Sequence, residues 1–315
     1  MNSTLLADKS EASLKRFLST LSPVDQVGAT SRVEALATRS IKTSSKNWAI
    51  DLAIRMVDLT TLEGADTPEK VRALCAKGVY PDPTDLTVPS VGAICVYNDM
   101  VKIARTALDA GGGKNIPVAA VATAFPSGRA SIEVKIQDTK DAIANGASEI
   151  DMVIDRGAFL AGKLGLVFEQ IEIIKGLCGD KAHLKVILET GELVTLDNVR
   201  KASYLAMLAG ADFIKTSTGK VAPAARAPVV YVMLEAVRDF YKMTGTKIGV
   251  KPAGGIRTTK DAIKLLVLVN EVAGPEWLDP TLFRIGASAL LNDLLMQRMK
   301  MRDGYYASPN YVTLD

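Results

Sequence analysis

The sequence contains a single histidine, His183, and this scarcity excludes several kinds of catalytic site. A catalytic zinc site usually draws on two or three histidines or on clustered cysteines, and neither set is available here. A Ser-His-Asp or Cys-His mechanism would have to use His183 alone. Because His183 begins the apolar run His183–Leu188, we interpret it as the entry of a strand rather than as a catalytic group. The sequence therefore predicts neither a metal ion nor another cofactor.

Cysteine is also scarce, since Cys75, Cys95 and Cys178 lie far apart and show no metal-ligand spacing. An odd number of isolated thiols is typical of a reducing compartment, which favours a cytoplasmic protein. No apolar run approaches the roughly 20 residues that a membrane span needs, and the amino terminus lacks the basic and apolar regions of a secretory signal. The net charge of +3 is small for 315 residues, so neither nucleic acid nor a membrane is expected as a partner.

What the sequence does contain is a regular alternation of short β-rich runs with helix-length segments. The segments between the runs carry apolar residues at three- and four-residue spacing, as in Met100–Leu108 and Val229–Tyr241. Strands that alternate with helices pair in parallel through right-handed crossovers, and eight such units close into a (β/α)₈ TIM barrel. The eight predicted strands are 54–59, 92–97, 117–123, 149–155, 183–190, 212–218, 247–255 and 283–288.

An open doubly wound sheet is the alternative fold. Such a sheet usually carries a glycine-rich first turn that binds a nucleotide. The first predicted strand is instead followed by Thr60-Thr61-Leu62-Glu63. The barrel is therefore the predicted fold.

The chain divides into three predicted parts. Residues 1–47 are polar and mixed, with one helical stretch around residues 14–18, and are predicted to form a short helical N-terminal extension. Residues 48–300 are predicted to form the catalytic barrel, with a proline-rich loop at Val79–Asp85 before the second strand. Residues 301–315 lack a helical period and are predicted to form a C-terminal tail over the surface.

Two lysines near the ends of consecutive strands are the candidate reactive groups. Active sites of such barrels lie at the carboxyl ends of the strands. In the sixth strand, Phe213, Lys215 and Ser217 share one face. If that face points inward, desolvation favours a neutral amine on Lys215, which can attack a carbonyl. Lys251 occupies the neighbouring seventh strand, and repulsion between two inward ammonium groups is expected to lower at least one of the two pKa values further.

An aspartate and a third lysine accompany this pair. Asp151 lies on the fourth strand, where an inward carboxylate could orient a water or relay a proton. Each lysine alone would ordinarily be a solvated surface charge, and Asp151 could simply pair with a buried lysine. Two lysines and an aspartate on three strands are harder to explain by structure alone, so Lys215, Lys251 and Asp151 are the predicted catalytic residues. Lys185 on the fifth strand is interpreted as inward-facing, with a structural or charge-balancing role.

The loops after the seventh and eighth strands are candidates for a phosphate site. In many barrels these loops, with a helix N-terminus, bind a phosphate group. Here they read Pro252–Arg257 and Gly286–Ser288, and their glycines would let backbone N–H groups approach an anion closely. Lys220, after the sixth strand, would add positive charge. Either loop alone could be an ordinary strand-to-helix turn, but both lie where a phosphate site is expected.

Four separated motifs support one family: Asp58–Leu62, Glu189–Leu193, Asp212–Lys220 and Val250–Arg257. In this order they resemble the deoxyribose-phosphate aldolases, which are class I, Schiff-base aldolases. The resemblance covers roughly residues 58–288. It implies reversible cleavage of 2-deoxy-D-ribose 5-phosphate to D-glyceraldehyde 3-phosphate and acetaldehyde, without a cofactor. The expected partners are a small phosphorylated sugar and acetaldehyde, and self-association into a homo-oligomer is left open.

The resemblance also implies roles for single residues. Lys215 would form the Schiff base, Lys251 would favour its neutral form and take part in proton transfer, and Asp151 would relay a proton through water. The implied substrate-binding residues are Asp58, Thr60, Cys95, Lys185 and Thr218. The implied phosphate-binding residues are Gly219, Lys220, Gly254, Gly255, Arg257, Gly286 and Ser288.

Some positions depart from the family's usual pattern. Asn98 stands where many members have proline, Ala124 where asparagine is frequent, and Ala289 where a second hydroxyl often holds the phosphate. Residues 221–226 lack a frequent Asn-Ala-Thr. Some members close the site with a C-terminal tyrosine, and whether Tyr305, Tyr306 or Tyr311 takes that place is open. Two alternatives stay open: a phosphosugar isomerase without an imine step, which would leave the paired lysines unexplained, and a catalytically weak barrel that acts as a binding protein, in which the departures would mark lost activity.

Overall fold

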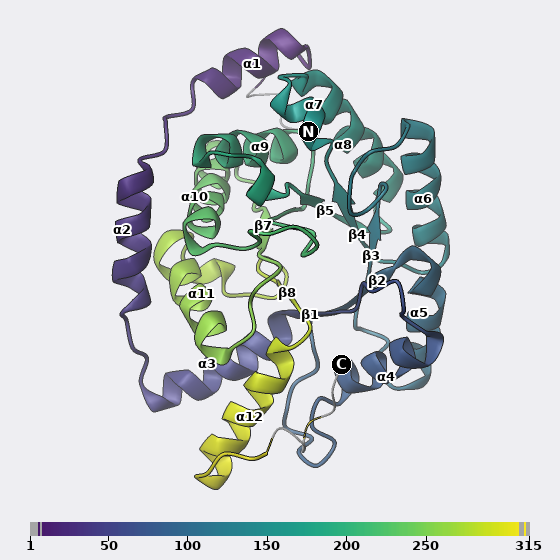
Figure 1. The fold of residues 1–315 in the computed structure, drawn as a ribbon, viewed down its shortest axis with the longest axis vertical. Coiled ribbons are helices and arrows are strands. Elements are labelled where there is room, and N and C mark those ends of the chain that lie inside the picture. The colour runs from purple at the N-terminus through teal and green to yellow at the C-terminus, as the bar shows by residue number, and fades with distance from the viewer. Residues whose placement is uncertain (1–5, 7, 309–311, 313–315) are drawn as a thin grey trace.

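The computed structural model describes residues 6, 8–308 and 312, and in them eight parallel strands alternate with helices (Figure 1). Neighbouring strands follow the chain in order from β1 to β7, and β8 pairs with β1. The strands are β1 (Val57–Thr60), β2 (Ala93–Tyr97), β3 (Val118–Ala122), β4 (Glu149–Val153), β5 (His183–Ile187), β6 (Phe213–Lys215), β7 (Gly249–Lys251) and β8 (Ile285–Ala287).

Backbone hydrogen bonds close the sheet into a barrel between β7 and β8. The N–H of Val250 donates to the carbonyl of Leu282 (2.9 Å), and the N–H of Arg284 donates to the carbonyl of Val250 (3.1 Å). The N–H of Gly286 then donates to the carbonyl of Pro252 (2.9 Å). These bonds leave no free edge between the last two strands, which confirms the predicted (β/α)₈ barrel.

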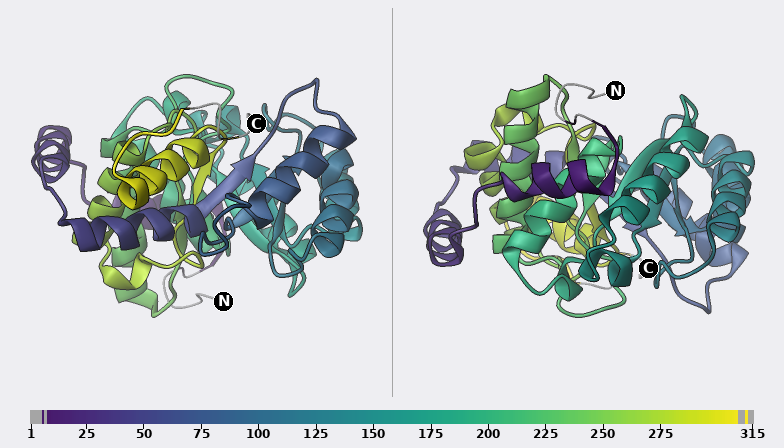
Figure 2. Two further views of the ribbon diagram at one scale, coloured as in Figure 1. Left: turned by 90° about the horizontal axis from the view of Figure 1, so that it is seen from below. Right: turned by 90° about the horizontal axis from the view of Figure 1, so that it is seen from above.

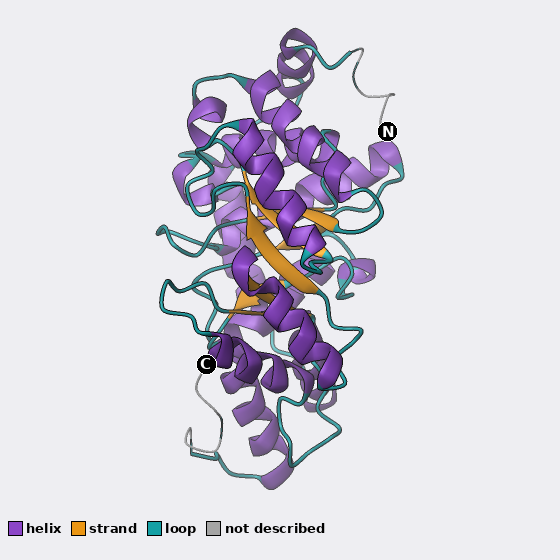
Figure 3. Cartoon of the chain, turned by 90° about the vertical axis from the view of Figure 1, so that its right-hand side faces the viewer, coloured by secondary structure: helices purple, strands orange, loops and turns teal. Residues whose placement is uncertain are grey.

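Helices surround the strands on all sides, as Figure 3 shows. Threonine N-caps begin several of them: the Thr67, Thr195 and Thr258 hydroxyls accept backbone N–H bonds in the first turn. The apolar outward side chains of the strands lie beneath this ring and form the main core. The helices after the strands are α4 (Pro68–Val79), α5 (Val101–Ala110), α6 (Ile132–Ala144), α7 (Arg156–Leu160), α8 (Leu164–Cys178), α9 (Leu196–Leu208), α10 (Ala227–Thr244), α11 (Thr259–Val272) and α12 (Leu290–Asp303).

The N-terminal extension wraps around the outside of this helical ring. Helix α1 (Glu11–Ser19) packs on α8 and α9, α2 (Gln26–Ala37) on α10 and α11, and α3 (Thr43–Met56) on α11 and α12. In both views of Figure 2, α2 lies at the outer edge of the molecule. The extension is therefore helical as expected, and it covers the side of the barrel that carries the last strands.

The predicted element boundaries need three corrections. Helix α3 runs through residue 47, and residues 54–56 belong to it rather than to the first strand, because Ile50, Ala53 and Ile54 continue its helical spacing into the core. Strands β6 and β7 are shorter than predicted, since their regular pairing with each other ends at Lys215 and Lys251. Helix α12 continues to Asp303, and so enters the predicted tail 301–315.

Two smaller expectations hold. His183 is the first residue of β5, and the proline-rich segment after α4 forms a loop before β2. Within the described part of the chain, no helix has the length and apolar character to span a membrane.

Candidate active site

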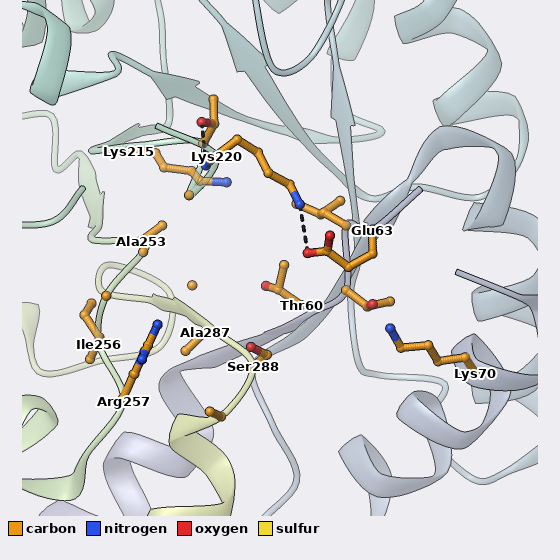
Figure 4. A pocket seen from close by; sticks show the side chains of 18 residues that line it. Thr60, Glu63, Lys70, Lys215, Lys220, Ala253, Ile256, Arg257, Ala287 and Ser288 are labelled. Atoms are coloured by element: carbon orange, nitrogen blue, oxygen red, sulfur yellow. Dashed lines mark hydrogen bonds and ion pairs between the residues drawn. The ribbon is translucent and has the colours of Figure 1, made fainter. Parts of the chain in front are cut away.

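A pocket of about 430 Å³ opens at the carboxyl ends of the strands, between the ends of β1, β6, β7 and β8 (Figure 4). Lys215 reaches into it from the end of β6. This is the end of the barrel at which catalytic residues were expected. Its wall consists of Thr60, Thr61, Leu62, Glu63, Lys70, Lys215, Thr218, Gly219, Lys220, Ala253, Gly254, Gly255, Ile256, Arg257, Gly286, Ala287, Ser288 and Ala289.

The structure brings Lys215, Lys251 and Asp151 into direct contact. Lys215 and Lys251 are register partners on β6 and β7. Both lysine Nζ atoms contact the same oxygen: Asp151 Oδ2 lies 2.8 Å from Lys215 Nζ and 2.7 Å from Lys251 Nζ. Lys215 keeps a small opening to the pocket, whereas Lys251 and Asp151 are fully buried below it. Of the three, only Lys215 is placed to meet a ligand in the pocket.

Lys251 lies between two carboxylates. Its Nζ is 2.5 Å from Asp58 Oδ2, in addition to its bond with Asp151. Burial alone would lower the pKa of Lys251, but the attraction of Asp151 and Asp58 outweighs burial and holds that pKa well above its usual value. The expected repulsion between the lysines therefore does not lower the pKa of Lys251. This side chain is a permanent buried cation beside Lys215.

Asp151 is the common partner of three lysines. Its Oδ1 lies 3.2 Å from Lys185 Nζ, so that Lys185, Lys215 and Lys251 all surround one carboxylate. Burial would raise the pKa of Asp151, but these three cations hold it well below its usual range. Asp151 is therefore ionised at any physiological pH.

Below this layer the charge network continues to Arg284, which precedes β8. Arg284 Nη1 lies 2.7 Å from Asp58 Oδ1, and Nη2 lies 3.1 Å from Glu149 Oε1. Glu149 in turn bonds Lys185. The connected cluster thus holds four cations (Lys185, Lys215, Lys251 and Arg284) and three carboxylates (Asp58, Glu149 and Asp151).

This count has a chemical consequence for Lys215. Isolated buried charge is strongly disfavoured, so a buried cluster is most stable when its charges balance. With every group ionised, the cluster carries one excess positive charge. It balances when Lys215, the member that opens to the pocket, is a neutral amine. A neutral amine is the form that can attack a carbonyl.

The predicted substrate-binding residues divide into two groups. Thr60 and Thr218 lie in the wall of the pocket. Asp58, Lys185 and Cys95 are fully buried and lie outside that wall. Asp58 and Lys185 belong to the charge network, a place that agrees with the charge-balancing role expected for Lys185 from its strand position. Cys95 packs in a small apolar cluster, and burial raises the pKa of its thiol.

All seven predicted phosphate-binding residues line the same pocket. The backbone is left-handed at Gly219 (φ +81°), Gly254 (φ +85°) and Gly255 (φ +82°), a conformation that favours glycine. At Gly254 a side chain would also collide with Ala224, whose Cβ lies 2.6 Å from the position of an added Cβ. The remaining four residues are Lys220, Arg257, Gly286 and Ser288.

The start of α12 completes this side of the pocket. Gly286, Ala287, Ser288 and Ala289 lead directly into the helix, which begins at Leu290. The first N–H groups of a helix have no partner within it and favour an anion. Glycine-rich backbone and the cations Lys220 and Arg257 thus lie together on this side of the pocket.

Sequence reasoning missed several residues of this region. Glu149 lies two residues before Asp151, and Arg284 lies two residues before Gly286, so strand alternation places each pair on one face. The sequence could therefore have indicated that Glu149 and Arg284 also face the barrel interior. Glu63 and Lys70 also line the pocket, but the loop and helix after β1 gave no periodic signal for them.

A fifth missed residue, Glu189, supports the pocket from behind. It is fully buried and adopts a left-handed conformation (φ +53°), which a non-glycine residue rarely does. Its carboxylate accepts a hydrogen bond from the Thr218 hydroxyl (2.5 Å) and from the Thr218 N–H (3.3 Å). Burial raises the pKa of Glu189. This residue holds in place the loop that carries Gly219 and Lys220.

The departures from the family pattern lie mostly away from the reactive lysine. Asn98 donates to the carbonyl and carboxylate of Asp138 (2.8 Å each), beside α6. Ala124 has a left-handed backbone (φ +60°). Tyr305 and Tyr306 are exposed, and Tyr311 lies outside the described residues. Ala289 alone of these positions lines the pocket.

The chain forms a closed β/α barrel, and the lysine in the pocket at the carboxyl ends of its strands contacts a buried network of charged side chains. This arrangement is typical of barrel enzymes that react through a lysine. Comparison with known proteins narrows this class. The model of the DeoC/LacD family aldolases matches residues 52–295, and the chain belongs to this family of carbon–carbon lyases. The assignment favours an aldolase over the isomerase and binding-protein alternatives.

Relatives of known name agree with the family. The human deoxyribose-phosphate aldolase is 46% identical over 288 residues, which cover 88% of this chain and 89% of the human one. The mouse protein of the same name is 46% identical over 280 residues, covering 86% and 87%. Among solved structures, a putative deoxyribose-phosphate aldolase from Coccidioides immitis is 29% identical with a TM-score of 0.64, covering 86% of this chain and 98% of that one.

Proposed function

We propose that this chain reversibly cleaves 2-deoxy-D-ribose 5-phosphate to D-glyceraldehyde 3-phosphate and acetaldehyde. The observation that carries the proposal is the position of Lys215, which lines the pocket while its Nζ contacts the buried carboxylate that it shares with Lys251. The names of the relatives supply the substrate.

The reaction begins with Schiff-base formation. The Lys215 amine attacks the C1 aldehyde of the open-chain sugar, and loss of water leaves an imine. The C3 hydroxyl then gives up its proton to a water held by Asp151, the C2–C3 bond breaks, and D-glyceraldehyde 3-phosphate leaves. The bond's electron pair remains on Lys215 as an enamine. Protonation of C2 and addition of water release acetaldehyde and restore the amine.

The buried partners of Lys215 serve these proton transfers. Asp151 stays ionised and bonds Lys215 Nζ, so it can hold the water that exchanges protons with the imine. Lys251 stays protonated and keeps Asp151 in place through its 2.7 Å contact. Its charge also disfavours an ammonium form of Lys215.

The phosphate group would bind at the opposite end of the substrate. Gly219, Gly254 and Gly255 line the pocket with a left-handed backbone, and Lys220 and Arg257 add positive charge at the same wall. When the phosphate holds one end of the sugar, the aldehyde at the other end meets Lys215 in a defined orientation. Such orientation of the reacting groups supplies a large part of enzymatic rate enhancement. The phosphate thus provides orientation as well as affinity.

The proposal is tested by following acetaldehyde release from 2-deoxyribose 5-phosphate. Lys215→Met should abolish release, while Lys260→Met, which removes an exposed lysine of α11, should retain it. Wild-type protein that leaves the sugar phosphate intact would contradict the proposal. So would full activity in Lys215→Met.

A cytoplasmic location and a homo-oligomeric form belong to the same proposal. Cys75, Cys95 and Cys178 are all buried free thiols, which suits a reducing compartment.

Val27 and Trp48 on the N-terminal extension are large apolar side chains with 76% and 51% of their surface exposed, which suits a contact between copies. Light scattering would measure the mass in solution, and a monomer at micromolar concentration would contradict the second point.

A further inference from the structure

An ion pair joins two walls of the pocket. Lys220, from the loop after β6, places Nζ 2.8 Å from Glu63 Oε1, from the loop after β1. Both residues line the pocket, and Figure 4 shows their side chains extended toward each other and joined by this contact. Lys220 is one of the cations that the proposed function assigns to the phosphate. In the ligand-free protein this cation is therefore already bound to a carboxylate.

The loop that carries Glu63 is held by a second carboxylate, Asp66. Asp66 accepts hydrogen bonds from the Thr61 hydroxyl (2.7 Å) and from the backbone N–H of Glu63 (2.9 Å), and it pairs with Lys70 (2.7 Å). These bonds fix the backbone of the turn. The side chain of Glu63 itself is 65% exposed and makes its ion pair with Lys220 alone among the described residues. Its backbone is thus fixed, while its carboxylate is free to leave Lys220.

We infer that Glu63 determines how strongly the enzyme prefers a phosphorylated substrate, because its carboxylate competes with the phosphate for Lys220. This inference rests on the proposed function, which places the phosphate at Lys220. A phosphate that binds Lys220 must displace Glu63 and then lie close to its negative charge. A sugar without phosphate meets neither cost. Glu63 therefore weakens phosphate binding selectively.

The size of the effect follows from the exposure of the pair. Ion pairs that are partly open to water are weak, and the strong end of their usual range corresponds to about a fivefold change in an equilibrium. An ion pair of this strength is easily exchanged for a phosphate, which carries more charge and can accept several hydrogen bonds. The pair can thus adjust the preference without blocking binding.

The test compares Glu63→Gln with Glu69→Gln. The control removes the same charge from an exposed glutamate of α4, which pairs with Arg72 outside the pocket. The quantity measured is the ratio of kcat/KM for 2-deoxyribose 5-phosphate to kcat/KM for 2-deoxyribose. Glu63→Gln should raise this ratio by up to about fivefold, and Glu69→Gln should leave it unchanged.

Three outcomes would overturn the inference. An unchanged ratio in Glu63→Gln would make the ion pair a surface contact without a role in substrate choice. A lower ratio would mean that Glu63 positions Lys220 for the phosphate. An equal rise in Glu69→Gln would make the effect one of overall charge.

Titration calorimetry with inorganic phosphate separates this inference from the proposed function, because it needs no catalysis. Glu63→Gln should bind inorganic phosphate more tightly than wild type by a similar factor, and equal affinity would overturn the inference. A wild-type protein that binds phosphate without cleaving the sugar phosphate would contradict the proposed function alone.

Discussion

Replacement of Lys251 by methionine tests whether the reactivity of Lys215 depends on the balance of charges in the buried cluster. Lys251 is fully buried against Asp58 and Asp151, so the substitution removes one cation and leaves both carboxylates in place. The cluster then holds three cations and three carboxylates. It balances when Lys215 is an ammonium ion, which cannot attack a carbonyl. We therefore expect the active form of the enzyme to require a higher pH.

The magnitude follows from the shared oxygen. Lys215 Nζ and Lys251 Nζ lie 2.8 and 2.7 Å from Asp151 Oδ2, so they can be no further apart than the sum of these distances, 5.5 Å. At that separation two unit charges repel by about 3 kcal/mol in a medium of dielectric constant about 20. Since one pH unit corresponds to about 1.36 kcal/mol, the acid limb of the rate–pH profile should move up by about 2 pH units.

The same substitution should also destabilise the fold. The raised pKa of Lys251 means that its contribution is fully present below the ordinary lysine pKa and is lost only as the pH rises through the raised value. At pH 7 the whole contribution is therefore removed, and breaking such a buried pair costs about 3–5 kcal/mol. Denaturant unfolding followed by circular dichroism would measure the loss and would show whether Lys251→Met remains folded for the rate assay.

A compensating variant separates charge from packing. Asp58→Asn with Lys251→Met removes one charge of each sign, so the cluster again balances with a neutral Lys215. The double variant should bring the acid limb back toward its wild-type position. A folded Lys251→Met protein with the original profile would refute the charge argument, and so would a double variant shifted as far as the single one.

Two further predictions concern strained backbone. Ala124→Asn should raise the free energy of unfolding by about 0.5–1 kcal/mol, because asparagine tolerates the left-handed conformation better than alanine does. Denaturant titration measures this free energy, and an unchanged or lower value would count against strain at this site. Glu189→Gln should raise KM for the phosphorylated sugar about fivefold, since it weakens the bonds to Thr218 that hold the phosphate loop. The control Glu192→Gln changes an outward glutamate of the same motif, and an equal rise in KM there would contradict this role for Glu189.

Much of the fold and the reactive pair could be predicted from the sequence, because both depend on local periodicity. Alternation placed Lys215 on one face with Phe213 and Ser217, and the strand order placed Lys251 on the neighbouring strand, where the register pairs the two lysines. The same rule failed at the start of β1. A short apolar run is compatible with either a strand or a helix, and Ile54 continues the helical spacing of α3.

The partners of Lys251 could not be predicted in the same way. Asp58 and Asp151 come from β1 and β4, and their distance from Lys251 depends on how the closed barrel brings its inner side chains together. The sequence indicated only the repulsion between the two lysines, whereas these carboxylates attract Lys251 and hold its pKa above its usual value. The Glu63–Lys220 pair was missed for a related reason, since it joins two loops whose positions no periodicity determines.

Trapping the proposed imine identifies the lysine that reacts with the aldehyde. The protein is incubated with acetaldehyde and borohydride, which reduces an imine to a stable ethyl amine, and the modified lysine is located by peptide mass spectrometry. We predict one ethyl group on Lys215, no such adduct in Lys215→Met, and none on Lys251, which is buried and stays protonated. An adduct on Lys251, or no adduct at all in a wild-type protein that cleaves the sugar phosphate, would contradict the account.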